Sequence, residues 1–249
     1  MSGHSKWTQI KRQKGATDAK RGQLFTKLGR EITVAAREGG GDQNANSRLR
    51  LAIQRAKDQN MPADNIERAI KRGTGELEGG SLDEVVYEGY GPGGAAILLE
   101  VLTDNRNRTV SEIRSAMTRH GGSLGEAGCV AWLFEQKGIV VAEAPDGRDE
   151  DLALLAIDAG AEDVNTEDSA LEVYTAPQNV ETVRRALETE GATVRSSEVA
   201  MVPKTTLALE EKDAIQAIRL LERLDELDDV QRVHTNAEFP NELLERIRG

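Results

Sequence analysis

The chain has little cysteine, few aromatic residues and no long apolar run. Its 249 residues include one cysteine, and Phe, Trp and Tyr together make up 3% of the sequence. A single cysteine, Cys129, excludes an internal disulfide and favours a reducing compartment. No apolar run approaches the roughly 20 residues that cross a bilayer, and no apolar core follows the first cations. We therefore expect a cytoplasmic protein without a membrane span or a targeting peptide.

Residues that commonly carry catalysis or bind metals are also sparse. The three histidines, His4, His120 and His234, lie far apart, and no Cys or His pair has metal-ligand spacing. No nucleophile motif and no Walker lysine occurs. Adjacent acids are abundant among 43 Asp and Glu, so they do not single out catalytic carboxylates. We therefore predict that the protein is not an enzyme and has no catalytic residue, cofactor or metal.

Negative charge dominates the chain, but it is unevenly distributed. The formal net charge is −11, whereas residues 1–75 contain sixteen Lys and Arg against seven Asp and Glu. The remainder must therefore carry a net charge near −20. A basic end on an acidic body is typical of a protein that touches a polyanion with that end only. The alternative is a solvated mixed-charge surface, which would intersperse both signs.

Three helices are predicted within this basic segment. The first begins at Asp18, buries an apolar residue at every fourth position and ends at the glycines of 39–41. The second and third are expected over 45–59 and 62–73, and short connections predict a small bundle. The last two could form a helix-turn-helix, but the exposed groups of the third suit phosphates better than base edges.

The cations of the basic segment predict phosphate contacts, which are the main source of affinity for nucleic acids. An aromatic residue among them, Trp7, predicts either stacking on a base or anchoring of the segment to its own domain. The candidate nucleic-acid-binding residues are Lys6, Trp7, Lys11, Arg12, Lys14, Lys20, Arg21, Lys27, Arg30, Arg48 and Arg55.

After a linker near residues 75–81, strands and helices alternate in an α+β pattern. Segment 138–201 has the look of a ferredoxin-like unit. The helix and strand after residue 205 have no local sheet, so they would complete the block before the unit. Strands are predicted over 83–88, 95–103, 129–135, 138–142, 170–174, 194–201 and 230–234, and helices over 109–119, 150–160, 180–190 and 212–226. The predicted domains are 1–77, 78–136 joined with 205–249, and 137–204.

A glycine-rich segment at 89–94 matches the dinucleotide fingerprint Gly-x-Gly-x-x-Gly. The fingerprint needs a helix at its last glycines, whereas the following residues predict a strand, so we predict a hairpin. Its bare backbone and two arginines at a helix start could also meet a phosphate. These secondary candidates are Gly91, Gly93, Arg106 and Arg108. Alternatively Asp104, Asn105 or Thr109 caps the helix and the arginines are solvated.

Longer motifs resemble one known family. They are residues 4–7 (HSKW), 18–22 (DAKRG), 25–28 (FTKL), 87–94 (YEGYGPGG), 104–109 (DNRNRT) and 160–163 (GAED). In this order they are similar to the YebC/PmpR family over nearly the full length. The resemblance implies a cytoplasmic, non-enzymatic protein of three domains. It also implies two competing functions, a DNA-binding transcription regulator and a translation factor acting on the ribosome.

The predicted fold class is α+β, with an N-terminal three-helix bundle followed by two ferredoxin-like α/β sandwich domains, the third inserted within the second. The predicted function is nucleic-acid-binding regulation of gene expression, of the transcriptional type. One alternative is a ribosome-associated translation factor that binds rRNA or tRNA. Another is an acidic protein-interaction module without nucleic acid contact. The family name favours DNA, whereas the lack of visible base-reading side chains favours RNA.

Overall fold

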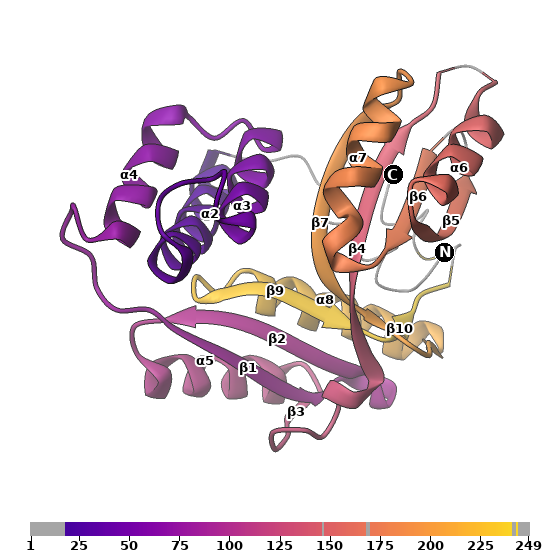
Figure 1. The fold of residues 1–249 in the computed structure, drawn as a ribbon. Helices are drawn as coiled ribbons and strands as arrows, with labels where there is room; N and C mark the ends of the chain where they lie inside the picture. The colour runs from indigo at the N-terminus through magenta and orange to yellow at the C-terminus, as the bar shows by residue number, and fades with distance from the viewer. Residues whose placement is uncertain (1–17, 146, 168–169, 241–242, 244–249) are drawn as a thin grey trace.

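The computed structural model describes residues 18–145, 147–167, 170–240 and 243, and Figure 1 shows a helical bundle beside two sheets. The helices are α2 (Asp18–Gly39), α3 (Ser47–Asp58), α4 (Ala63–Thr74), α5 (Arg106–Arg119), α6 (Asp149–Asp158), α7 (Val180–Thr189) and α8 (Glu211–Asp225). The strands are β1 (Asp83–Tyr90), β2 (Ala96–Thr103), β3 (Ser123–Leu124), β4 (Phe134–Glu143), β5 (Ala161–Glu167), β6 (Ala170–Thr175), β7 (Thr193–Pro203), β8 (Leu207–Ala208), β9 (Val230–Thr235) and β10 (Ala237–Glu238).

The bundle of α2, α3 and α4 confirms the three helices predicted in the basic segment. Its core joins Leu28 and Ile32 of α2 to Leu49 of α3 and Ile66 of α4. The side chain of Asn46 caps α3 by accepting the backbone N–H of Leu49 at 3.0 Å, and this contact satisfies one of the free donors at the helix start. Apolar spacing and the glycines at helix ends were therefore sufficient to predict these helices.

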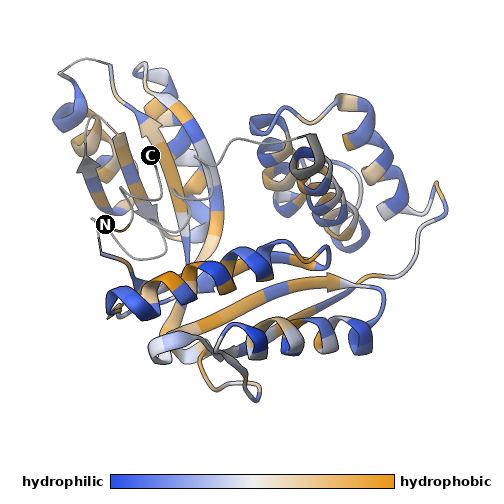
Figure 2. Ribbon diagram, turned by 180° about the vertical axis from the view of Figure 1, so that it is seen from behind, coloured by the Kyte–Doolittle hydropathy of each residue, from blue (hydrophilic) through white to orange (hydrophobic). Residues whose placement is uncertain are grey.

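The first four-stranded sheet has the order β3-β1-β2-β9. β1 and β2 form the predicted glycine-rich hairpin, with Tyr90 opposite Ala96. β9 comes from the far end of the chain and pairs with β2, so the strand after residue 205 completes the earlier block as predicted. In Figure 2, α5 and α8 cover one face of this sheet, and their apolar residues share one core with β2 and β9.

The second four-stranded sheet has the order β5-β6-β4-β7, with every neighbouring pair antiparallel. Its elements follow the order βαββαβ along the chain, which is the ferredoxin-like arrangement. Residues of α6 and α7, among them Leu152 and Leu187, bury the apolar side of β4 and β6. The whole unit lies in sequence between β3 and β9, so it is inserted within the domain of the first sheet.

Parts of the predicted secondary structure are wrong, and the two-residue strands β3, β8 and β10 were not predicted. The strand expected over 129–135 begins only at Phe134, and residues before it form a 3₁₀ turn. The buried Glu88 carboxylate accepts the backbone N–H groups of Gly128, Val130 and Ala131, which takes these donors away from a sheet ladder. The edge strand β5 was not predicted, because its sequence, AEDVNTE, has three acids and little apolar alternation.

The bundle and the two sheet domains touch one another. α3 lies along β7, and Leu51 packs against the apolar core of the second sheet. α2 faces the chain around residues 225–229 through hydrogen bonds that span about two hundred positions of sequence. Among the described helices, none has the length and apolar character needed to cross a membrane.

Candidate nucleic-acid interface

Several predicted contact residues lie where the structure gives no description. The residues outside the described ranges are Lys6, Trp7, Lys11, Arg12 and Lys14. The side chain of Lys20, at the start of α2, is also not described. Their role in binding therefore stays a prediction, and the geometry of the interface rests on the cations of α2, α3 and α4.

Two predicted cations of α2 face the body of the protein. Lys27 is 8% exposed and donates a hydrogen bond to the carbonyl of Asp225, whose carboxylate lies 3.7 Å from the Lys27 ammonium. Arg30 donates to the carbonyl of Asp228 at 2.8 Å and to the carboxylate of Asp229 at 2.7 Å. Both side chains therefore hold α2 against the body. These contacts use much of their capacity to donate hydrogen bonds.

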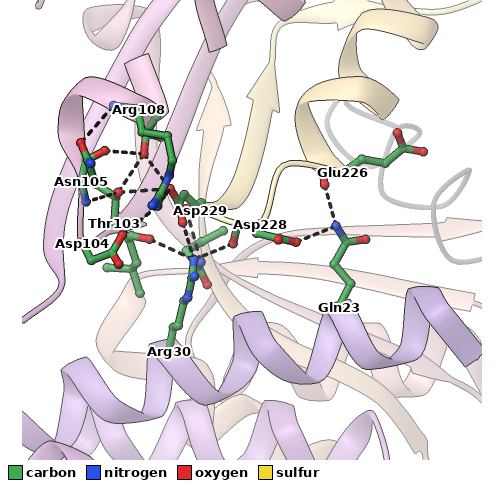
Figure 3. Close-up of polar contacts among 12 residues, drawn as sticks. Gln23, Arg30, Thr103, Asp104, Asn105, Arg108, Glu226, Asp228 and Asp229 are labelled. Atoms are coloured by element: carbon green, nitrogen blue, oxygen red, sulfur yellow. Dashed lines mark hydrogen bonds and ion pairs between the residues drawn. The ribbon is translucent and has the colours of Figure 1, made fainter. Parts of the chain in front are cut away.

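The buried Asp229 carboxylate is the centre of this contact, as Figure 3 shows. One oxygen accepts from Arg30, and the other accepts from Arg108 at 2.7 Å, Thr109 at 2.6 Å and Thr103 at 3.1 Å. Burial alone would raise the pKa of Asp229, but the hydrogen bonds from Thr109, Arg108 and Arg30 outweigh it and lower the pKa to about 2. We call these five residues the Asp229 cluster.

A second polar cluster lies where the three domains meet. Glu31 of α2 accepts from Arg55 of α3 at 2.9 Å and from Arg232 of β9 at 2.7 Å. Arg232 also donates to the carbonyl of Val199 in β7 at 2.6 Å. The cluster extends through Glu100 to His234, whose Nε2 lies 3.0 Å from a Glu100 oxygen. The guanidinium of Arg55 also lies 3.7 Å from the Glu198 carboxylate of β7, so this predicted contact residue links the bundle to the inserted domain.

Glu100 is strongly perturbed at this junction. Burial raises its pKa, but the hydrogen bond with His234 and the charges of Arg232, His234 and Arg55 lower the pKa to about 2. The carboxylate is therefore ionised at neutral pH, and it lies 3.6 Å from the Arg232 guanidinium of the neighbouring strand. Arg48, another predicted contact, is similarly paired with Glu38 and with Glu84 at 2.8 Å.

The secondary candidates around the glycine-rich hairpin also have structural roles. Asn105 caps α5 by accepting the backbone N–H of Arg108 at 3.1 Å, in agreement with the capping alternative. Arg106 pairs with Asp83 at 2.7 Å, and Arg108 belongs to the Asp229 cluster. The two arginines are therefore ion-paired within the chain.

The glycines of the hairpin are explained by close packing against β2, the segment before α8 and the start of α8. Gly91 is buried, and a Cβ on it would meet the Ile97 side chain at 3.0 Å. Gly93 has φ +68 and would place a Cβ 2.7 Å from Leu209 and 3.2 Å from the carboxylate of Asp213. The binding role of Gly91 and Gly93 stays a prediction, and the Asp213 carboxylate is unfavourable for a phosphate beside Gly93.

Other cations of the bundle have no carboxylate partner among the described residues. The guanidinium of Arg21 lies 5.7 Å from the centre of the Phe25 ring, and Arg37 and Arg50 donate to backbone carbonyls. The remaining members of this set are Lys57, Arg68 and Arg72. Arg68 and Arg72 are not among the candidate residues predicted from the sequence, although their spacing of four residues on one helix was an available signal.

A groove of about 680 Å³ lies between α2, α4 and the linker that leads to β1. Arg68 and Arg72 line it together with Asn65 from α4, while α2 contributes Phe25 and Arg30. Glu78 of the linker and Asp104 after β2 add negative charge. Within the described ranges, no group of three or more His, Cys, Asp and Glu could hold a metal ion. Two of the six cations without a carboxylate partner among the described residues, Arg68 and Arg72, therefore line the same groove.

The fold and this interface define an α+β protein with a cationic helical domain attached to two sheet domains. A family model described as "TACO1/YebC protein N-terminal domain" matches residues 5–76, and one described as "TACO1/YebC second and third domain" matches residues 82–237. The chain belongs to the TACO1/YebC family.

Relatives of known name cover the full length. A "Probable transcriptional regulatory protein cbdbA400" of Dehalococcoides mccartyi is 56% identical, over 99% of this chain and 98% of the relative. A "Probable transcriptional regulatory protein" of Moorella thermoacetica is 56% identical over 99% of both chains. The crystal structure of the conserved hypothetical protein Aq1575 from Aquifex aeolicus has a TM-score of 0.82 and 48% identity, covering 90% of this chain and 93% of that one.

Proposed function

We propose that this protein is a nucleic-acid-binding regulator of gene expression that holds its target with the basic bundle. The observation that carries the proposal is the separation of charge, because residues 1–75 have nine more cations than acids whereas the rest of the chain is strongly acidic. Phosphate contacts by Lys and Arg provide most of the affinity in such interfaces. The names of the relatives, which describe transcriptional regulators, agree with this role.

The ion pairs described above orient the bound polymer. Lys27, Arg30 and Arg55 fix the bundle on the acidic body, so the cations without carboxylate partners are left for the ligand. We infer a division of labour in which residues 1–77 hold nucleic acid, and 78–136 with 205–249 and the inserted 137–204 face away from it or contact proteins. Repulsion by the acidic body restricts binding to one orientation. A protein with this task would act in the cytoplasm.

RNA is the second candidate target, and the character of α4 favours it. In a helix-turn-helix the first turns of the recognition helix approach base edges. The corresponding part of α4 carries Asp64 and Glu67, which would repel the phosphates that line a DNA groove. RNA-binding proteins instead use shape, phosphates and unpaired bases. In that case regulation would act on messages or on the ribosome rather than on promoters.

The test measures binding of the full-length protein to a short DNA duplex, a single-stranded RNA and purified ribosomes, by fluorescence anisotropy and by co-sedimentation. Affinity should fall steeply between about 50 and 200 mM salt. Reversing Lys11, Arg12 and Lys14 to Glu should weaken binding to all sequences alike and should reduce the salt slope by about three, since each phosphate contact contributes about 0.9.

A matched variant controls for net charge. Reversing Arg114, Arg119 and Lys212, which are exposed on α5 and α8, adds the same negative charge away from the bundle and should leave affinity nearly unchanged. Equal losses in both variants would mean that net charge alone matters and would contradict a localised interface. Absence of binding to all three targets would favour the protein-interaction alternative.

A further inference from the structure

The groove between α2 and α4 has cations that the protein itself does not use. Arg68 and Arg72 stand one helical turn apart on α4, are exposed, and have no ion pair or hydrogen bond among the described residues. Residues four apart on a helix project from the same face. Each guanidinium offers several donors in one plane, which suits a phosphate. Two of them in a row can therefore contact two phosphates of one strand. This contrasts with Lys27, Arg30 and Arg55, which are held by acids of the body.

Next to these arginines the groove offers an aromatic surface and a free amide. Phe25 lines the groove and is half-buried, with the Arg21 guanidinium 5.7 Å from its ring centre. Aromatic rings and guanidinium planes are the groups on which unpaired bases stack. The side-chain amide of Asn65 has no partner among the described residues and can both donate to and accept from a base or a ribose.

The α2 backbone along the groove is bare at two glycines inside the helix. A Cβ on Gly22 would meet nothing within 4 Å, and one on Gly29 would meet only the end of Met61 at 3.9 Å. Packing within the described chain therefore does not require either glycine, although glycine is unfavourable in a helix interior. Gly73 of α4 differs, because its Cβ would lie 2.4 Å from the Thr33 carbonyl. The bare positions leave room for an occupant to approach α2 closely.

Acidic residues at the same groove favour one orientation of a bound nucleic acid strand. Asp104 is paired with Arg108 at 2.7 Å, so its charge is largely compensated. Glu78 is exposed on the linker. A carboxylate repels phosphates but accepts hydrogen bonds from the amino groups of bases. The groove therefore suits a strand that turns its phosphates towards α4 and its bases towards α2 and the linker.

We propose that this groove binds a short segment of unpaired RNA, with phosphates at Arg68 and Arg72 and a base against Phe25. The proposal rests on the proposed function and names its target. A volume of about 680 Å³ is in the range of ligand pockets, roughly 300–1,000 Å³, so a duplex can touch only the rim. RNA loops present unstacked bases, whereas duplex DNA must first be opened at a cost of a few kcal/mol.

The test compares variants of the full-length protein in anisotropy titrations with a labelled single-stranded RNA, the single-stranded DNA of the same sequence and the DNA duplex. The double variant Arg68→Ala/Arg72→Ala should weaken RNA binding at least about tenfold, because each lost phosphate contact removes counterion release. The control Arg114→Ala/Arg119→Ala loses the same charge from the exposed face of α5 and should change affinity by less than about twofold.

The variant Gly29→Ala separates a ligand-binding glycine from a structural one. Alanine should raise the thermal unfolding midpoint, since it favours the helix and meets ordinary contact distances, yet it should weaken RNA binding. A lower midpoint, or unchanged RNA affinity, would contradict the assigned role of the groove.

The outcomes distinguish the two proposals. If the wild type binds none of the three nucleic acids, the proposed function itself fails. If it binds and the groove and control variants behave alike, the groove assignment fails while the proposed function stands. Equal or tighter binding of the DNA duplex with the same loss in Arg68→Ala/Arg72→Ala would overturn the assignment to unpaired RNA. Tighter binding of single-stranded DNA than RNA would overturn the choice of RNA.

Discussion

Replacing Asp229 by Asn should weaken the attachment of the bundle to the body more than any neighbouring substitution of similar size. The carboxylate is 3% exposed and accepts from Arg30, Arg108, Thr103 and Thr109. Asparagine has almost the same shape, but it removes the charge and turns an NH₂ group towards donors. Two guanidinium groups would then lose their shared counterion, and one buried contact would become repulsive.

The magnitude follows from the pKa of Asp229, which lies at about 2. This is nearly two units below the ordinary value for Asp, and at about 1.4 kcal/mol per unit it corresponds to roughly 2 kcal/mol of stabilisation at neutral pH. Leaving a buried donor without an acceptor adds about 1–3 kcal/mol. Arg30 and Arg108 are partly exposed and Arg108 keeps Asp104, which limits the sum. We expect a loss of about 2–4 kcal/mol.

The assay is urea unfolding of Asp229→Asn at neutral pH, followed by far-ultraviolet circular dichroism. The control is Asp228→Asn, because Asp228 is exposed and accepts a hydrogen bond from Gln23 at 3.0 Å; it should change the free energy of unfolding by less than about 0.5 kcal/mol. Equal effects of the two substitutions, or a loss below about 0.5 kcal/mol for Asp229→Asn, would refute the reasoning.

Three further predictions concern acid stability, packing and thiol chemistry. Since the pKa values of Glu100 and Asp229 are lowered to about 2, their stabilisation is complete above the unfolded-state values and is lost as pH falls; the thermal midpoint should drop between about pH 4.5 and 2, and a flat profile there would contradict this. Gly73→Ala should lower the free energy of unfolding by about 1–3 kcal/mol through overpacking, and the thermal midpoint with it, because its Cβ would meet the Thr33 carbonyl at 2.4 Å; a higher midpoint would disprove the clash. Burial and then the charge of a nearby carboxylate raise the pKa of the Cys129 thiol, so iodoacetamide should react slowly at neutral pH and faster in denaturant; equal rates would argue against this environment.

Local sequence patterns predicted most of the elements because local forces determine them. The four-residue apolar spacing of α2 and the glycines at its end need no distant partner. The return of β9 to the earlier block was also predicted, since a strand with no local sheet must find another edge, whereas its pairing with β2 is known only from the structure. In contrast, β5 is a polar edge strand, and its pairing with β6 rather than its own side chains determines its conformation.

The turn before β4 shows a different limit of local patterns. Residues 129–133 read as a strand, yet the Glu88 carboxylate, about forty positions earlier, captures their backbone donors. This capture depends on the tertiary position of β1, which residues 129–133 do not encode by themselves. Hydrogen-bond partners from distant segments can therefore override local propensity.

The sequence by itself determined that this protein has a cationic helical end and an acidic α+β body, because composition and periodicity are properties of the chain. Only the tertiary structure decided which cations are available to a ligand. Lys27, Arg30 and Arg55 are neutralised by acids that docking brings together from distant positions. Arg68 and Arg72 point into a groove that the linker and α2 complete. Ion pairing depends on distances of a few ångströms, and those distances exist only after the domains pack.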